Sequence, residues 1–351
     1  MSDDNSKLFQ IVRYSSNDKK SWNNYVDNHI DGTFFHLAEW CELTQDIFRH
    51  QSHYLYAKCD DGDEVVGVLP LVEQKSKLFG HSLISTPFCV YGGAIADNEV
   101  IRCALENEAL NIGEKLGVDY VELRYRYPTA NKNYERFCHH STFSCELAQS
   151  REEILANIKK KQRANIRQSL KKGMSFRIDQ DTKVAYDIYS ESVRNLGTPV
   201  FNAKYFPKLA ELFGEKVDVL TVESEGRTVS SVLSFYYKGE VLPYYGGGTF
   251  EARALKSNDL MYYELMSHAV DKGCTSFDFG RSKDESGAFK YKSTWGMTPK
   301  PLHYMRALVC ASEHPNLSPN NPKYSLVINT WKKLPLSISR LVGPFISKYL
   351  G

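Results

Sequence analysis

The chain contains an internal repeat, which constrains its fold more than any other feature of the sequence. The segment WNNYVDNHIDGTFFHLAEWCEL, which starts at Trp22, aligns with YDIYSESVRNLGTPVFNAKYFPKL, which starts at Tyr186. Further matches follow in the same order: VVGVLPLV with TVSSVLSFYY, VYGGAIAD with YYGGGTFE, and EKLGVDYVELR with VDKGCTSFDFGR. The sequence therefore predicts two copies of one domain.

Each copy shows the same order of expected elements. In the second copy, a helix at 184–196 and another short helix are followed by two strands joined by the turn KGE and by an extended segment ending at glycines 246–248. An amphipathic helix at 260–270 should end before Gly273, whose missing side chain permits the left-handed conformation. A closing strand is expected at 276–279. This order predicts an α+β domain with a mixed, mainly antiparallel sheet.

The repeat divides the chain into four parts. We expect a first domain at 1–150, a basic linking helix at 151–174, a second domain at 175–312 and a basic, apolar tail at 313–351. Between positions 159 and 172 the linking helix carries seven basic residues and no acidic one. Such a run is either a solvated helix face or an anion-binding surface. The second alternative is supported by the lack of acidic residues, which solvated faces use for pairing along the helix.

The composition limits what the chain can do. It has 351 residues and a net charge of +2, so it is not the strongly cationic protein that a general nucleic-acid coat would be. The eight cysteines lack the spacing of a zinc site, so we expect reduced thiols and no metal. The polar start MSDDNSK and the lack of a long apolar run predict a cytoplasmic protein with no secretory signal and no spanning helix.

Four stretches carry a family resemblance: KKKQRANIRQSLKKG, RNLGTPVF, YYGGGTFEARALKSNDLMYYE and FDFGRSKDESGAFKYKSTWG. With them the chain resembles FemAB-like members of the acyl-CoA N-acyltransferase (GNAT) superfamily, in the branch with two tandem domains. The tail NPKYSLVINTWKKLPLSISRLVGP further resembles the subgroup found with exosortase and exopolysaccharide systems. The resemblance implies an α+β fold of two tandem GNAT-like domains.

The resemblance also implies a reaction. Such enzymes form an amide by moving an acyl or aminoacyl group onto an amine, here of a cell-envelope or exopolysaccharide precursor. The donor, aminoacyl-tRNA or acyl-CoA, would be a co-substrate, and no tightly bound cofactor is implied. The chain lacks both the [RQ]-x-x-G-x-[GA] pyrophosphate loop and the coiled-coil arm of some tRNA-dependent members, so the donor stays open. The alternative hypothesis is a non-catalytic adaptor that binds a polyanionic glycan lipid or an assembly partner.

Two residues are predicted to be catalytic. Attack on an ester or thioester carbonyl creates an oxyanion, which a fixed cation can stabilise. The resemblance implies that Lys290 does this; the alternative is a surface lysine. Asp278 would face a polar cleft or serve as a structural partner of a nearby group. Lys292 faces the same side as Lys290 if this stretch is extended. Glu39 and Glu264, like Asp278, are candidates for the general base.

Further residues are predicted to bind substrate. Arg281 and Ser282 follow the closing strand, at the edge where such sheets expose ligand sites. Arg163 and Arg167 share one helix face and could hold one phosphate. Tyr245 precedes the glycine run, which is a flexible strand end or only a bulge. The complete predicted set is Arg163, Arg167, Tyr245, Arg281, Ser282, Phe289 and Lys292.

The tail from Lys323 to Gly351 holds five basic residues, no acidic residue and many apolar ones. Pro335 and Pro344 should divide it into short helices. Docking onto the catalytic domains is the favoured outcome. The alternative is peripheral contact with the inner membrane face, where anionic lipid attracts lysines and Trp331 suits the interface.

Overall fold

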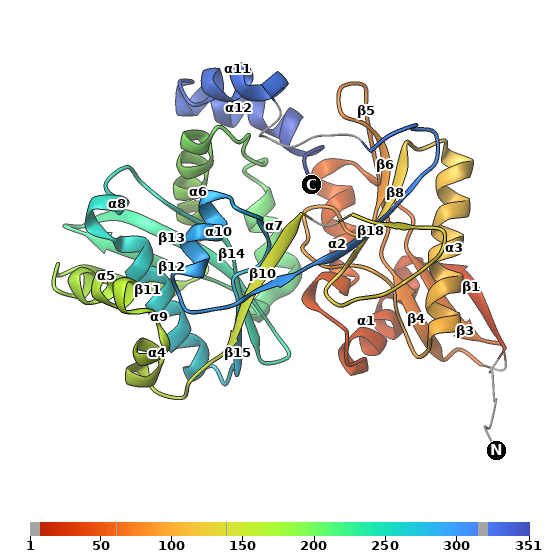
Figure 1. Ribbon diagram of the computed structural model, residues 1–351, viewed down its shortest axis with the longest axis horizontal. Coiled ribbons are helices and arrows are strands. Elements are labelled where there is room, and N and C mark those ends of the chain that lie inside the picture. Colours follow the sequence, from red (N-terminus) through yellow and green to blue (C-terminus); the bar gives the residue numbers. More distant parts are fainter. Residues whose placement is uncertain (1–7, 61, 138, 315–321) are drawn as a thin grey trace. The chain divides into compact units, whose positions relative to one another are not determined.

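The computed structural model of the chain describes residues 8–60, 62–137, 139–314 and 322–351 (Figure 1). These residues form two compact units. The first comprises 8–137, 302–314 and residue 351, and the second comprises 139–301 and 322–350. Both units are α+β structures with mixed, mostly antiparallel sheets, as the sequence predicted.

The first unit contains three α-helices and two sheets among its described elements. In chain order these are β1 (Phe9–Arg13), α1 (Lys19–Asn28), α2 (Glu39–Leu43), β2 (Gln51–Ser52), β3 (Leu55–Cys59), β4 (Val65–Leu69), β5 (Val72–Ser76), β6 (Gly80–Ile84), β7 (Ile95–Ala96), α3 (Glu99–Leu116), β8 (Tyr120–Tyr125), β9 (Glu135–Arg136) and β18 (His303–Leu308). The strand orders are β1-β3-β4-β7 and β2-β5-β6-β8-β18-β9. In the second sheet β6 and β8 run parallel.

The second unit has one large sheet covered by helices. Its elements are β10 (His140–Glu146), α4 (Arg151–Asn157), α5 (Lys160–Leu170), β11 (Ser175–Asp179), α6 (Thr182–Leu196), α7 (Tyr205–Phe213), β12 (Val217–Ser224), β13 (Arg227–Tyr237), β14 (Glu240–Gly248), α8 (Ala252–Leu255), α9 (Ser257–Asp271), β15 (Ser276–Asp278), β16 (Ser282–Lys283), α10 (Gly287–Ser293), β17 (Pro299–Pro301), α11 (Pro322–Trp331) and α12 (Leu336–Ser347). The strand order is β11-β12-β13-β14-β15-β10-β16, and β17 also pairs with β10.

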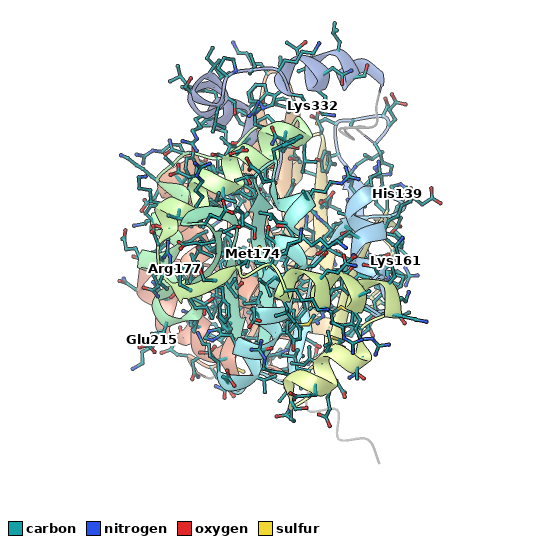
Figure 2. All side chains as sticks on the ribbon, turned by 90° about the vertical axis from the view of Figure 1, so that its left-hand side faces the viewer. His139, Lys161, Met174, Arg177, Glu215 and Lys332 are labelled. Atoms are coloured by element: carbon teal, nitrogen blue, oxygen red, sulfur yellow. The ribbon has the colours of Figure 1, made fainter. Side chains whose placement is uncertain are left out.

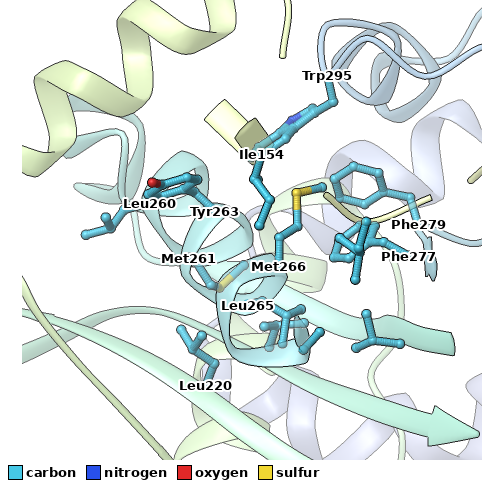
Figure 3. Packing of buried hydrophobic residues seen from close by; sticks show 14 of the residues in the cluster. Ile154, Leu220, Leu260, Met261, Tyr263, Leu265, Met266, Phe277, Phe279 and Trp295 are labelled. Carbon is cyan, nitrogen blue, oxygen red and sulfur yellow. The ribbon is translucent and has the colours of Figure 1, made fainter. Parts of the chain in front are cut away.

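The core of the second unit forms around α9, because this helix is apolar on several sides. Figure 3 shows Leu260, Met261 and Leu265 of α9 packed together with strand residues, in a cluster that also holds Ile154 and Trp295. The helix ends as predicted: Gly273 has a φ of 80°, and its N–H donates to the Val270 carbonyl. The sequence predicted this helix end correctly because the conformation of a helix terminus depends mainly on neighbouring residues.

The unit boundaries differ from the predicted domain limits of 150 and 312. Strand β10 lies inside the predicted first domain but pairs with β15 of the second unit, while β18 lies inside the predicted second domain but pairs with β8 of the first. Each unit thus completes its sheet with a strand from the other side of the predicted boundary. Strand pairing is a long-range interaction, which sequence repeats do not reveal.

The predicted linking helix at 151–174 is instead two helices that belong to the second unit. Helices α4 and α5 are separated at Ile158 and Lys159, whose backbones are extended. The side chains of Ile154, Ile158 and Ile166 are buried in the core of this unit. The segment is therefore part of the second domain and not a free connection.

The tail packs onto the second unit, as favoured from the sequence. Arg340 of α12 forms an ion pair with Asp187 of α6 at 3.0 Å and donates to the Ser190 hydroxyl at 2.9 Å. Gly343 fits closely, since a Cβ there would lie 2.8 Å from the Val200 carbonyl oxygen. Trp331, predicted to suit a membrane interface, is instead buried, so its indole cannot reach lipid.

Other predictions concern thiols and the membrane. The seven cysteines within the described ranges are free thiols, and Cys138 lies outside those ranges, as does the N-terminal stretch MSDDNSK. Among the described residues, no helix combines the length and apolar character required to cross a bilayer. In the same residues, no group of three or more His, Cys, Asp or Glu side chains could hold a metal ion.

A buried ionic group joins β8 to β18 in the first unit. Glu122 accepts from Arg124 Nε at 2.9 Å and from Arg306 Nε at 3.1 Å. Burial alone would raise the pKa of Glu122, but the two guanidiniums outweigh it and lower this pKa to about 2. The Glu122 carboxylate therefore attracts Arg306 of β18, and this attraction adds to the backbone hydrogen bonds between β8 and β18.

We expect Glu122→Gln to lower the free energy of unfolding by about 3 kcal/mol, because two guanidiniums would stay buried without an opposite charge. Chemical denaturation at neutral pH measures this, with exposed Glu114→Gln as the control. The folded-state pKa is depressed, so the wild-type contribution is present above about 4.5 and is lost as the pH falls toward about 2. If the difference in free energy of unfolding between the wild type and Glu122→Gln stays constant over this pH range, the stabilisation does not come from the Glu122 charge.

Candidate functional site

The site lies where two parallel strands of the second unit part. Strands β14 and β15 pair only through Glu240 with Ser276 and Val241 with Phe277. Beyond these pairs, β14 continues to Gly248 along β13, and no backbone hydrogen bond joins it to β15 among the described residues. Backbone groups of β14 that face away from β13 are therefore not used by the sheet.

The side chain of Tyr262 fills the space between the parted strands. Its ring lies 4.9 Å from that of Phe279 after β15 and 5.9 Å from that of Trp295. On the β14 side, a Cβ on Gly246 would meet the Tyr262 hydroxyl at 2.7 Å. Burial raises the pKa of Tyr262 to about 12, and Asp259 adds to this, so the phenol keeps its proton at neutral pH.

Close packing explains the glycine run at the end of β14. A Cβ on Gly247 would meet Ser192 at 2.7 Å, and one on Gly248 would meet Ala252 at 2.6 Å. A bulge precedes this run at Tyr244, because Leu233 of β13 pairs with Tyr245 and the next residue, Ser234, pairs with Pro243. The three glycines themselves pair in regular register with β13, so the run is not the bulge, and its missing side chains allow helices to approach both faces of the strand.

Lys292 of α10 closes the carboxyl end of β15. Its ammonium donates to the carbonyl oxygens of Phe279 at 2.7 Å, Gly280 at 2.9 Å and Arg281 at 3.2 Å. An ammonium has three N–H donors, so all of them are used. Burial lowers the pKa of Lys292 to about 8; Asp278 opposes this shift and Arg281 adds to it.

Asp278 is fully buried beside this lysine. Its Oδ1 accepts from the Thr142 hydroxyl at 2.6 Å and from the Gly280 N–H at 2.8 Å. The first bond ties β15 to β10, and the second fixes the turn of the backbone that follows β15. Asp278 thus bonds a backbone group, as its predicted structural role requires, and its catalytic role stays a prediction.

Lys290 and Lys292 face different sides, because this stretch is the helix α10 and not extended. Lys290 is exposed to solvent, whereas Lys292 points inward. Phe289 packs edge-on against Phe143 of β10 at 5.0 Å and fixes the helix to the sheet. The two lysines would share a side only in an extended stretch, and in a helix a spacing of two residues places them on different sides.

Arg281 and Ser282 follow β15 as predicted. The Arg281 side chain is partly exposed beside Lys292, and its backbone carbonyl is one of the three acceptors. Ser282 is buried and pairs with Ser141 of β10. The Ser282 hydroxyl has no hydrogen-bond partner in the part of the chain that the structure describes.

A buried polar network connects the basic helix α5 to this site. The Asp259 Oδ1 accepts from Gln162 Nε2 of α5 at 2.6 Å and from the Tyr291 hydroxyl of α10 at 2.8 Å. Lys256 adds a second link from the start of α9 to the Asn165 side chain at 2.7 Å. Burial raises the pKa of Asp259, and the two donors partly offset this.

The basic side chains of α5 surround this anchored helix. Arg167 and Lys161 are exposed, and Lys161 projects from the surface in Figure 2. Arg163 is half-buried, and one of its N–H groups donates to the Ala156 carbonyl at 3.1 Å. Arg163 and Arg167 therefore share one helix, but only Arg167 is fully open to solvent.

Tyr245 lies apart from the lysine. Its hydroxyl is 2.7 Å from that of Tyr205, and its ring contacts Phe206 and Tyr189 on α7 and α6. Neighbouring strand residues alternate faces, so Tyr245 points to these helices while Gly246 points to α9. The structure does not bring Tyr245 together with Lys292.

Two of the candidate bases have other partners. Glu264 is buried and binds Arg151 Nη2 through both oxygens, at 2.6 and 2.8 Å. Glu39 lies in the first unit, where it binds Lys19 at 3.3 Å and Asn23 at 3.0 Å. Each carboxylate is thus held in an ion pair within its own unit.

The corresponding strand pair of the first unit is sealed. After β6 and β8 pair at Ile84 and Glu122, the N–H groups of Gly92 and Gly93 both donate to the Arg124 carbonyl, at 3.0 and 2.8 Å. A Cβ on Gly93 would overlap the Tyr125 ring. The backbone edge that stays open in the second unit is thus occupied in the first.

Sequence reasoning missed the residues that complete the site. Tyr262, Asp259 and Gln162 fall inside stretches quoted for the resemblance, but nothing in the sequence marks their positions between elements. The glycine at 246 was the available signal, because a strand residue without a side chain indicates that another group approaches closely.

Comparison with known proteins finds a match to the part of the chain that forms this site. The family model described as Acetyltransferase (GNAT) domain matches residues 159–293, which run from the basic helix to the end of α10. A lipid II:glycine glycyltransferase of Staphylococcus saprophyticus is 29% identical over 96 residues, which cover 25% of this chain and 23% of that protein. The match is thus confined to about a quarter of each chain.

Solved structures share the whole fold. The crystal structure of FemX matches with a TM-score of 0.66 at 15% identity, covering 91% of this chain and 100% of that one. A tandem GNAT protein from the clavulanic acid biosynthesis pathway matches with a TM-score of 0.55 at 12% identity, covering 87% and 100%. These likenesses show that the chain folds as two GNAT-type domains in tandem.

We expect Asp259→Ala to lower the free energy of unfolding by about 1–3 kcal/mol, because Gln162 and Tyr291 would lose a buried acceptor. Thermal or chemical unfolding measures the loss. Asp271→Ala is the matched control, since Asp271 is exposed on the same helix. Equal stability of the two variants would show that the network does not hold α5 to α10.

Proposed function

Because the chain is a FemAB-like protein with the GNAT fold, we propose that it forms an amide by transferring an acyl or aminoacyl group onto an amine. The observation that carries this proposal is the early parting of β14 and β15 next to Lys292. A strand edge that β15 does not pair with, a fixed cation and a protonated phenol are gathered there. These are the groups that an acyl-transfer site requires.

The reaction is a nucleophilic substitution at a carbonyl carbon. The amine nitrogen attacks the ester or thioester carbon of the donor, the C–N bond forms, and the C–O or C–S bond to the donor breaks. The nitrogen loses one proton, and the leaving oxygen or sulfur gains one. In the transition state the carbonyl oxygen becomes negative, so donors aimed at it contribute most to the rate.

The residues of the site divide this work. Backbone N–H groups on the open edge of β14 are suited to bind the carbonyl oxygen. Tyr262, whose phenol is protonated at neutral pH, is suited to give a proton to the leaving group. Lys292 is a positioning residue: it holds the backbone after β15 and keeps a positive charge next to the reacting groups.

The basic helix α5 supports a donor or acceptor that carries phosphate. No acidic residue occurs between positions 159 and 172, and Lys160, Lys161, Arg167 and Lys171 are exposed. Both aminoacyl-tRNA and acyl-CoA have phosphates that such a surface attracts. The hydrogen bonds of Asp259 fix the basic helix α5 relative to α10, so the proposed phosphate-binding surface and Lys292 are held in one arrangement.

The acceptor is proposed to be an amine on a cell-envelope precursor. The relative from Staphylococcus saprophyticus is named as a lipid II:glycine glycyltransferase, which supports this class. An exopolysaccharide precursor, a cytoplasmic location and the exosortase-associated subgroup stay predictions from the sequence. The peripheral membrane contact rests on a different surface and is argued separately below.

Turnover tests this proposal directly. The full chain is incubated with mixed aminoacyl-tRNAs or with mixed acyl-CoAs, each with a cell extract that supplies amines, and new amides are detected by mass spectrometry. A new amide with one donor class supports the enzyme and identifies that class. Binding of a phosphorylated glycan without any new amide would favour the alternative, a non-catalytic adaptor.

We expect Lys292→Met to lower kcat roughly 10²-fold, because a fixed cation and the bonds to three carbonyls are lost. Lys290→Met is the matched control on the same helix and should retain the wild-type kcat, since Lys290 is exposed. The wild-type kcat should also fall as the pH rises through about 8, where Lys292 loses its proton, and this fall should be missing in Lys292→Met.

The opposite pattern would decide between the lysines. If Lys290→Met loses kcat and Lys292→Met does not, the role that the family resemblance implied for Lys290 is correct. Thermal unfolding of both variants shows whether either change acts through stability alone.

A further inference from the structure

Helix α12 exposes its apolar side and buries its small polar side. The buried residues Ser339, Gly343 and Ser347 are four positions apart and lie on one face. The exposed residues include Leu341 and Phe345, each with 71% of its surface accessible. An ordinary surface helix has the reverse arrangement, with its apolar face toward the core.

The contacts of α12 explain why its inner side need not be apolar. Arg340 binds Asp187 and Ser190 of α6, and its guanidinium lies 5.5 Å from the centre of the Tyr186 ring. Gly343 allows the helix backbone to approach Val200. Docking onto the second unit therefore uses an ion pair and small residues. The exposed side chains of Leu341 and Phe345 play no part in it.

These apolar side chains form a continuous stripe. Positions 338, 341, 342 and 345 fall on one face of a helix, because they are spaced by three and four residues. All four are exposed apolar residues, and Leu326 and Val327 of α11 add to the exposed apolar surface of the tail. We call these six residues the tail face: Leu326, Val327, Ile338, Leu341, Val342 and Phe345.

The charged side chains of the tail itself are all basic. Lys332 and Lys333 are exposed in the connection between α11 and α12; Figure 2 shows Lys332 at this end of the unit. Positions 322–351 contain no Asp or Glu, while the Arg340 charge is already paired with Asp187. An exposed apolar stripe bordered by lysines and without acids is complementary to a surface that is apolar inside and anionic outside.

We propose that the tail face binds the surface of a bilayer that contains anionic lipid. The helix would lie in the plane of the interface, with Leu341 and Phe345 among the acyl chains and the lysines among the headgroups. No described helix can span a bilayer, so the contact is peripheral. The inference depends on this surface and not on the proposed reaction, and it can be tested with lipid alone.

The test is co-sedimentation of the full chain with two kinds of vesicle, one of phosphatidylcholine and one of equal parts phosphatidylcholine and phosphatidylglycerol. The wild type should sediment with the anionic vesicles, and added salt should weaken this binding. Leu341→Asp with Phe345→Asp should lower the partition coefficient more than roughly tenfold. Lys332→Ser with Lys333→Ser should lower it about fivefold for each lysine on anionic vesicles only.

The matched control carries the same change in charge on exposed apolar residues elsewhere. Ile30→Asp with Val100→Asp alters side chains that are 91% and 69% accessible in the first unit. This control should bind vesicles as the wild type does. Thermal unfolding of each variant shows that the chain is still folded.

Two outcomes would overturn the proposal. One is a tail-face variant that binds vesicles as well as the control does. The other is a wild-type chain that binds neither kind of vesicle; sedimentation velocity then shows whether it self-associates and whether Leu341→Asp with Phe345→Asp dissociates it. If both are observed, the tail face is an interface between copies of this chain.

Discussion

In the second unit, the parallel pairing of β14 with β15 ends after Val241 and Phe277, and the geometry of the site follows from this early end. Tyr262 fits between the strands because Gly246 has no side chain, and the backbone after β15 needs Lys292 to hold its three carbonyls. A longer ladder would satisfy the edge of β14 and exclude the phenol. The unfinished ladder therefore makes donors available that sheet formation would otherwise use.

The first unit shows what happens when the same edge is completed. Its parallel strands β6 and β8 are followed by Gly92 and Gly93, which bond to the Arg124 carbonyl and pack against Tyr125. Thus one copy of the repeat is closed by its own backbone and the other stays open. Duplication of a domain explains the shared architecture, while a few backbone bonds explain why only the second unit presents the candidate site.

The sequence predicted features that depend on neighbouring residues and missed those that depend on distant ones. The repeat, the α+β class and the glycine after α9 follow from local patterns, and the structure contains them. Whether Lys290 and Lys292 share a side depended on whether one short stretch is extended or helical, which the sequence left open and the structure shows as helical. The roles of Tyr262 and Asp259 depend on contacts between α9, α10 and β14, which single-sequence patterns do not encode.

The exchange of strands across the predicted domain boundary has a consequence for how the chain is made. Strand β18 fills the position between β8 and β9 in the first unit, yet it follows the whole β10–β17 part of the second. During synthesis from the N-terminus, β8 leaves the ribosome long before its partner exists. The first unit therefore waits with an open edge, and the later sheet closes before the earlier one. An open edge that persists during translation is a point where chaperone binding competes with aggregation.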